Sequence, residues 1–247
     1  MKAPIVLAPV TLLTLLEYIL KNHVEQAIVV VCSSREDFLR KMLQPLQNSD
    51  EDHTSCPLLT PTLELLKSSQ TVQLVFCPTL QTLHAWLCSR LSIMKPNHTG
   101  GNDDGVPGLT DHGIFQGQLL VIIDVVILHR NTSSFSAQGL GRTFAAMVDS
   151  AFHLRRQLVI AECFEPEPQE PALAASEDES EHTSTVAGHN HDAIQEKPWN
   201  EDVSILNVTT KSFGAGERGW MGRTVKIGQI VARWCTFKTL PENASNG

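Results

Sequence analysis

The hydrophobic pattern alternates between short, unbroken apolar runs and longer stretches with helical periodicity. Apolar runs of strand length occupy residues 4–8, 26–32, 71–77, 118–129 and 157–163. Stretches with helical spacing lie between them, at residues 11–20, 35–43, 60–66, 79–94 and 139–156. Runs rich in Val, Ile and Leu without alternation indicate strands buried on both faces of a parallel sheet. Strands that alternate with helices imply right-handed crossovers and helices on both faces. The pattern therefore predicts an α/β fold with a mostly parallel central sheet.

The C-terminal quarter of the chain has a different pattern. Short segments at residues 203–209, 224–229 and 230–237 have strand character. They lack the long helical stretches that parallel crossovers need. We therefore predict that the last two are antiparallel strands of the same sheet.

Composition changes mark two insertions and a tail within one domain spanning residues 1–247. Residues 95–117 are rich in Gly, Asn and Asp and predict a flexible insertion, and residues 239–247 predict a flexible tail. Residues 165–198 form an acidic insertion, in which 165–196 holds nine acids and neither Lys nor Arg. Such a segment buries too little apolar surface to offset its ordering entropy, which predicts disorder.

Charge and composition bound the class of protein. The net charge of −8 over 247 residues comes mostly from the acidic insertion, because the other residues hold 18 acids against 19 bases. A nucleic-acid surface is therefore compatible with the overall acidity. No apolar run reaches the ~18 residues that span a bilayer, so we expect no membrane association. The six cysteines show no C-x-x-C spacing, and four lie in or beside apolar runs, which favours buried, reduced thiols inside the cell.

Asp124 is the single acid within the apolar run 118–129. An ionised carboxylate inside a sheet costs several kcal/mol unless it is paired. Asp124 is therefore expected at the carboxyl end of a strand or against a partner. Four or five apolar residues followed by Asp is also how a P-loop ATPase presents its magnesium-side acid. We therefore predict that Asp124 is a buried structural acid that accepts from a backbone or hydroxyl donor, in preference to a catalytic acid.

The junction between the first strand and the first helix is where a P-loop protein would bind phosphate. Its glycine-rich loop supplies backbone N–H groups and a Lys. Residues 8–11 read Ala-Pro-Val-Thr, with no Gly and no Lys, and Pro9 has no N–H to donate. This junction is not expected to bind ATP, so we predict no cofactor and no catalytic residue.

Two other groups of residues resemble binding sites in their composition. Residues 139–143, Gly-Leu-Gly-Arg-Thr, resemble a fragment of a phosphate loop, but the first glycine is missing and Arg replaces Lys, so a helix start is favoured. His182, His189, His191 and Asp192 lie in the acidic insertion, where nothing fixes a coordination geometry, and are expected to be solvated. We predict no metal site.

Residues 211–226 carry four glycines, four bases and two aromatic side chains. A flexible loop of this composition suits the phosphates and exposed bases of single-stranded DNA. The alternative is a glycine-rich hairpin tip that Trp220 anchors to the fold. The candidate DNA-contacting residues are Lys211, Arg218, Trp220, Arg223 and Lys226.

Taken together, these segments resemble the core of the RecA-like recombinase paralogues, especially the small subunits of Shu-type complexes and the partners of SWIM-domain proteins. The likeness is carried by residues 4–8, 29–35, 77–83, the Walker B-like run 119–124 and the closing segment 232–237. It covers most of the ordered chain. The missing Walker A loop departs from the family pattern.

The resemblance implies a RecA-like P-loop NTPase-type fold and a non-catalytic subunit. Such a subunit would pair with another recombinase paralogue or a SWIM-domain protein, bind DNA and assist homologous recombination in the nucleus. Two alternatives stay open. One is a RecA-like subunit of the Elongator accessory subcomplex, which supports tRNA modification and would place the protein in the cytoplasm. The other is an atypical ATPase.

Overall fold

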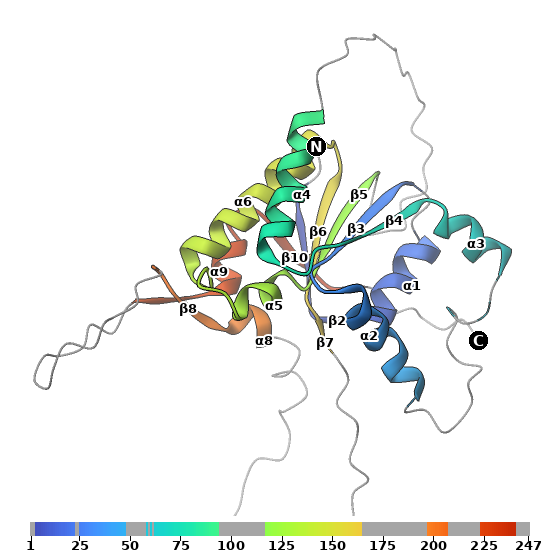
Figure 1. Cartoon of the computed structure of the whole chain (residues 1–247), viewed down its shortest axis with the longest axis horizontal. Coiled ribbons are helices and arrows are strands. Elements are labelled where there is room, and N and C mark those ends of the chain that lie inside the picture. The colour runs from blue at the N-terminus through green and yellow to red at the C-terminus, as the bar shows by residue number, and fades with distance from the viewer. Residues whose placement is uncertain are drawn as a thin grey trace, which may run out of the picture.

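The computed structural model describes residues 3–22, 25–47, 58, 60, 62–93, 117–164, 197–206 and 223–240. Six parallel strands form the central sheet in the order β10-β1-β6-β5-β3-β4 (Figure 1). Their bounds are β1 Ile5–Leu7, β3 Ala27–Val31, β4 Val72–Phe76, β5 Leu119–Ile123, β6 Gln157–Ala161 and β10 Thr236–Lys238. The predicted α/β class and parallel sheet are confirmed.

The inner strands show why the unbroken apolar runs predicted the sheet. Every residue of β3, β5 and β6 is buried, because helices cover both faces. The edge strand β4 is only partly covered, and Leu74 remains 43% exposed. Burial on both faces removes the polar alternation that a half-exposed strand would show.

The helices form two layers, one on each face of the sheet (Figure 1). One layer contains α1 (Leu12–Asn22), α2 (Arg35–Gln47) and α3 (Leu63–Ser69). The other contains α4 (Leu80–Ile93), α5 (Val125–Arg130), α6 (Ala137–His153) and α9 (Ile227–Val231). Each layer packs its own hydrophobic cluster against the sheet, the first around Leu15, Ile19 and Phe38 and the second around Phe144 and Met147.

The prediction of one strand through residues 118–129 is wrong. The strand β5 ends at Ile123, Asp124 adopts the left-handed conformation (φ 63°, ψ 36°), and α5 begins at Val125. Val125 and Val126 of α5 are buried in the hydrophobic cluster of the second layer, whereas Ile127 is 37% exposed. A short buried helix and a buried strand have the same apolar composition, so periodicity alone does not separate them.

The C-terminal prediction is confirmed only in part. An antiparallel pair is present, but β8 (Asp202–Ser204) and β9 (Thr224–Lys226) form a separate two-stranded sheet. The expected strand at 230–237 is wrong in its first half, because α9 runs to Val231 and presents Ile227, Ile230 and Val231 to the core at helical spacing. The last strand, β10, is parallel to β1, not antiparallel.

Three further short elements complete the fold. The strand β2 (Val10–Thr11) pairs in parallel with β7 (Cys163–Phe164), and α8 (Lys197–Asn200) precedes β8. Most of the three predicted flexible segments lies outside the described residues, although Gly117, Lys197–Pro198 and residues 239–240 fall within them. Among the helices of the described ranges, none combines the length and apolar character needed to cross a bilayer.

Candidate functional site

The carboxyl ends of the parallel strands meet at one edge of the sheet, where open α/β folds commonly bind ligands. Asp124 follows β5 at this edge, Glu162 follows β6 and Cys32 follows β3. All three side chains are buried. The sheet therefore brings two acids and a thiol together on three adjacent strands.

Asp124 lies where the sequence predicts, at a strand end and against partners. Its carboxylate accepts two bonds, from the backbone N–H of Cys163 to Oδ1 at 2.8 Å and from Lys41 Nζ to Oδ2 at 2.9 Å. The backbone donor agrees with the expectation for a structural acid, whereas the lysine was not foreseen. Both oxygens of Asp124 are engaged by the protein itself.

Lys41 reaches Asp124 from α2, in the first helical layer. The helix begins after Ser34, whose hydroxyl accepts from the backbone N–H of Asp37 at 3.0 Å and so caps the helix. The Lys41 side chain is 21% exposed and that of Asp124 is 4% exposed. The ammonium group of Lys41 therefore occupies the side of the Asp124 carboxylate where a metal ion would otherwise bind.

Glu162 is a site residue that sequence reasoning missed. It follows β6, and its carboxyl oxygens accept from the backbone N–H groups of Val126 at 2.7 Å and Ile127 at 3.4 Å, at the start of α5. Burial, reinforced by the charge of Asp124, raises the pKa of Glu162 to about 8. Lys41 places a positive charge beside Asp124, the other acid of the pair. The missed signal was an acid directly after an apolar run, the same pattern as at Asp124.

The cysteines at this edge are not activated. Burial is the main cause that raises the pKa of both Cys32 and Cys163, and the neighbouring acids raise it further. A nucleophilic cysteine needs a lowered pKa. These two thiols therefore pack as small apolar groups, in agreement with the predicted buried cysteines.

The junction after β1 does not form a phosphate loop. Val10 lies in β2, in register with Cys163 of β7, so extended backbone fills the place where a loop would turn. Thr11 accepts from the N–H of Thr14 through its hydroxyl at 3.2 Å. Because the N–H of Cys163 also bonds Asp124, the acid lies close to this junction.

No known family or curated protein matches this chain. The site is therefore interpreted from its own geometry. Within the described ranges, no three His, Cys, Asp or Glu side chains are grouped so that they could hold a metal ion.

Residues 139–143 lie in the first two turns of α6, as the helix prediction required. A Cβ at Gly139 would stand 2.0 Å from the carbonyl oxygen of Ser134, so the glycine permits close packing. Ser136 caps the helix, and its hydroxyl accepts from the N–H of Gly139. This glycine serves helix packing, not a phosphate loop.

Thr143, at the end of the same motif, belongs to a buried polar group. Its hydroxyl lies 2.9 Å from Nε2 of His84 and 3.0 Å from Nε2 of His129. His129 is fully buried, and burial lowers its pKa to about 4, with a smaller contribution from His84. Its Nδ1 makes no hydrogen bond of ordinary geometry within the described structure. Both histidines are therefore neutral at pH 7.

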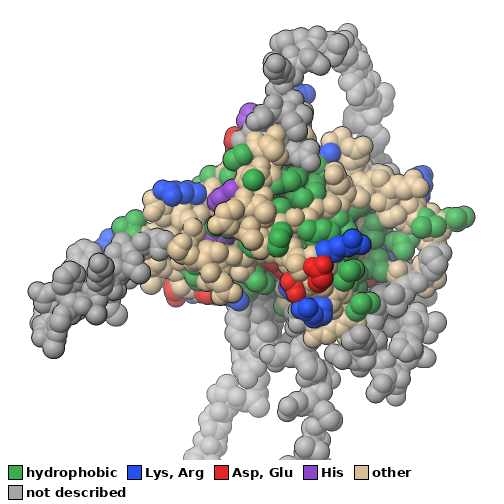
Figure 2. Space-filling view, viewed as in Figure 1, with side chains coloured by type: hydrophobic (Ala, Val, Ile, Leu, Met, Phe, Trp, Pro, Cys, Tyr) green, Lys and Arg blue, Asp and Glu red, His purple; other side chains and the backbone are tan. Residues whose placement is uncertain are grey.

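The candidate DNA-contacting residues are only partly described. Lys211, Arg218 and Trp220 lie outside the described residues. Arg223 and Lys226 are exposed at the two ends of β9, and no described hydrogen bond or ion pair joins them to Asp124. On the face shown in Figure 2, the Lys and Arg side chains are scattered among other groups. DNA contact by residues 211–226 stays a prediction.

Proposed function

We propose that this protein is a non-catalytic subunit with a RecA-like core, held within a complex that assists homologous recombination. The observation that carries the proposal is the pairing of Asp124 with Lys41 at 2.9 Å. In a nucleotide hydrolase, the acid at this strand end serves the magnesium side of the site. Here a side chain of the same protein supplies the positive charge.

The fold supports the RecA-like core at the level of architecture. A six-stranded parallel sheet lies between two helical layers, with Asp124 at the carboxyl end of β5. Asp124 is connected to the β1–α1 junction through Cys163, which bonds the acid and lies opposite Val10. This arrangement is compatible with a RecA-like fold whose phosphate loop has been lost.

The junction itself supports a role that does not depend on ATP hydrolysis. A phosphate loop works by pointing several backbone N–H groups at the ligand. Pro9 has no N–H, and Val10 and Thr11 are engaged in strand β2. The residues after β1 therefore cannot form the ring of amides that ATP needs.

The recombination assignment rests on the resemblance of the chain to the recombinase paralogues, and purification of the tagged full-length protein from cells tests it. We expect a recombinase paralogue or a SWIM-domain protein to co-purify in stoichiometric amount from the nucleus. Recovery of Elongator subunits from the cytoplasm would overturn the recombination role while leaving the scaffold interpretation intact.

Nucleotide binding tests the non-catalytic part separately. Labelled ATP with Mg²⁺ should show no saturable binding to the purified protein up to millimolar nucleotide. Saturable binding, accompanied by hydrolysis that Asp124→Asn abolishes, would show that the protein is an atypical ATPase.

A further inference from the structure

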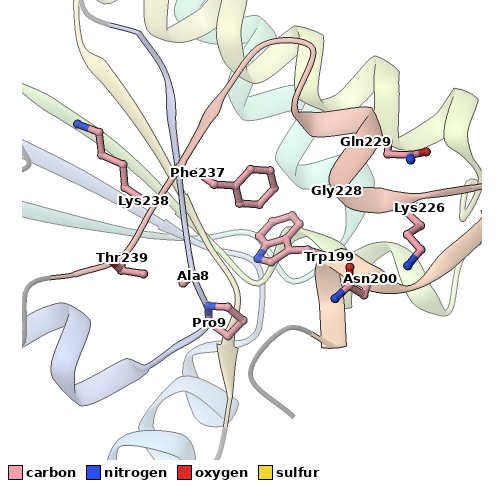
Figure 3. A pocket seen from close by; sticks show the side chains of 10 residues that line it. All are labelled: Ala8, Pro9, Trp199, Asn200, Lys226, Gly228, Gln229, Phe237, Lys238 and Thr239. Carbon is pink, nitrogen blue, oxygen red and sulfur yellow. The ribbon is translucent and has the colours of Figure 1, made fainter. Parts of the chain in front are cut away.

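A second concave site lies at the other end of the same sheet edge, beyond the carboxyl ends of β1 and β10. Its volume is about 730 Å³, within the range of sites that bind a small ligand or a peptide side chain. Ala8 and Pro9 form one wall, the buried Trp199 and the 45% exposed Phe237 form the apolar surface, and Lys226 and Lys238 stand on the rim (Figure 3). We call this the Trp199 pocket.

The unpaired donor in the wall of this pocket points to a ligand. Trp199 is 5% exposed, and its Nε1 has no hydrogen-bond acceptor in the described structure. Figure 3 shows this nitrogen on the edge of the indole turned toward Pro9, opposite the side that faces Phe237. A buried N–H without an acceptor costs ~1–3 kcal/mol, which a ligand with a carbonyl or carboxylate oxygen would recover.

The indole is held in this orientation by its neighbours. Trp199 and Phe237 pack edge to face, with ring centroids 5.9 Å apart and an interplanar angle of 80°. A Cβ at Gly228 would lie 3.0 Å from the backbone carbonyl oxygen of Trp199, so the glycine lets α9 pack closely against the backbone that carries the indole. The N–H is therefore fixed before any ligand arrives, which lowers the entropy cost of binding.

The rim gives the pocket its charge. Lys226 ends β9 and Lys238 ends β10, both are exposed, and neither forms an ion pair with another described residue. Figure 3 shows the two lysines on opposite sides of the aromatic pair. A ligand that satisfies both must extend across the pocket and carry negative charge on each side.

These features favour a peptide over a nucleotide chain. The edge-to-face aromatic pair leaves no parallel slot that would sandwich a base, and the two ammonium groups do not converge on one phosphate. Asp202 lies opposite Lys226 in the β8–β9 pair, so it lowers the attraction of this lysine for any anion. In a peptide ligand, a backbone carbonyl would match the Trp199 N–H and an apolar side chain would match the aromatic pair. Two flanking acidic side chains would match the two lysines.

We infer that the Trp199 pocket binds an acidic peptide segment of a partner protein, with an apolar side chain in the pocket and a backbone carbonyl on Trp199 Nε1. Nε1 is enclosed on the side of the indole that faces Pro9, so the acceptor reaches it when the wall at Pro9 moves. This inference goes beyond the proposed function and does not depend on which complex contains the protein.

The test uses the full-length protein and a fluorescein-labelled decapeptide of Glu and Pro with one central Leu. We expect saturable binding by fluorescence anisotropy, and a Gln-for-Glu version of the peptide should bind more weakly. Lys226→Gln and Lys238→Gln should each weaken binding about threefold to fivefold, the range for an exposed ion pair. Lys67→Gln, which changes a base in the last turn of α3, is the matched control and should leave binding unchanged.

The indole donor is followed directly by NMR. The Nε1–H signal of Trp199, assigned from its loss in Trp199→Phe, should shift downfield as the peptide is added. Absence of peptide binding, or binding that neither lysine variant weakens and that leaves this signal unmoved, would overturn the proposal. A shift caused by a dT₁₂ oligonucleotide and not by the peptide would assign the pocket to nucleic acid instead. Partner co-purification is measured separately, so the two proposals can fail independently.

Discussion

Replacing Lys41 by Met should destabilise the protein by leaving Asp124 buried without its cation. At 2.9 Å and an effective dielectric constant of about 20, two unit charges attract by about 6 kcal/mol, much of which offsets their desolvation. Removing one partner of a fully buried pair costs ~3–5 kcal/mol. Lys41 is 21% exposed and Asp124 keeps its bond to Cys163, so we expect a loss of about 2–3 kcal/mol.

Urea unfolding followed by circular dichroism measures this loss, and the adjacent base supplies a matched control. Arg40 pairs with Asp37 on the surface of the same helix, so Arg40→Met should leave the urea midpoint unchanged within error. The double variant Lys41→Met, Asp124→Asn removes both charges and should recover to within about 1 kcal/mol of the native protein. If the urea midpoint of Lys41→Met is no lower than that of Arg40→Met, Lys41 and Asp124 do not form a buried, coupled pair. The same conclusion follows if the double variant is no more stable than Lys41→Met.

Three further predictions concern pH and packing. The pKa of His129 is lowered to about 4 in the folded state, so the unfolded chain takes up the proton first and the contribution of His129 to stability should fall as pH drops from about 6.5 to 4. Because Glu162 titrates in the opposite sense over part of this range, the unfolding free energy is compared at pH 7 and 5 in the Glu162→Gln variant, where equal values would contradict the prediction. The pKa of Glu162 is raised to about 8, so its contribution is fully present below about 4.5 and lost as pH rises to 8. Glu162→Gln should therefore remove this fall, so the unfolding free energy of the variant should rise relative to that of the native protein between pH 5 and 8. A constant difference would show that the carboxyl is ionised throughout. Gly139→Ala should cost about 1–3 kcal/mol because its Cβ meets the Ser134 carbonyl, whereas Gly141→Ala, whose nearest contact is 3.8 Å away, should be neutral or stabilising by thermal melting.

The sheet could be predicted from the sequence because its inner strands are buried on both faces. The predicted segment 26–32 is one residue longer than β3 at each end, and 157–163 starts where β6 starts and ends two residues after it. The lateral order of the strands could not be predicted, since apolar runs show that a strand is buried but not which strands are its neighbours. The prediction failed at 118–129, where strand and helix are both apolar, and in the first half of 230–237, where helical spacing was taken for a strand.

Only part of the candidate site could be predicted from the sequence. Asp124 stood out because it interrupts an apolar run, and its position at a strand end follows from the cost of burying a charge. Lys41 could not be assigned to it, because the two residues are 83 positions apart and meet only when α2 packs on the sheet. Glu162 was absorbed into the predicted strand. Trp199 could not be connected with Phe237, because the pocket depends on how α8 and β10 fold back beside β1.

The ammonium group of Lys41 beside Asp124 makes the proposed loss of hydrolase activity hard to reverse. A glycine-rich turn grafted between β1 and α1 would still face an acid that is already neutralised, and removing the lysine alone would leave an uncompensated charge in an intact scaffold. Gaining the glycine-rich turn alone would restore no activity, and losing Lys41 alone would destabilise the protein. If the proposed loss occurred, selection would offer no gradual route back to hydrolysis.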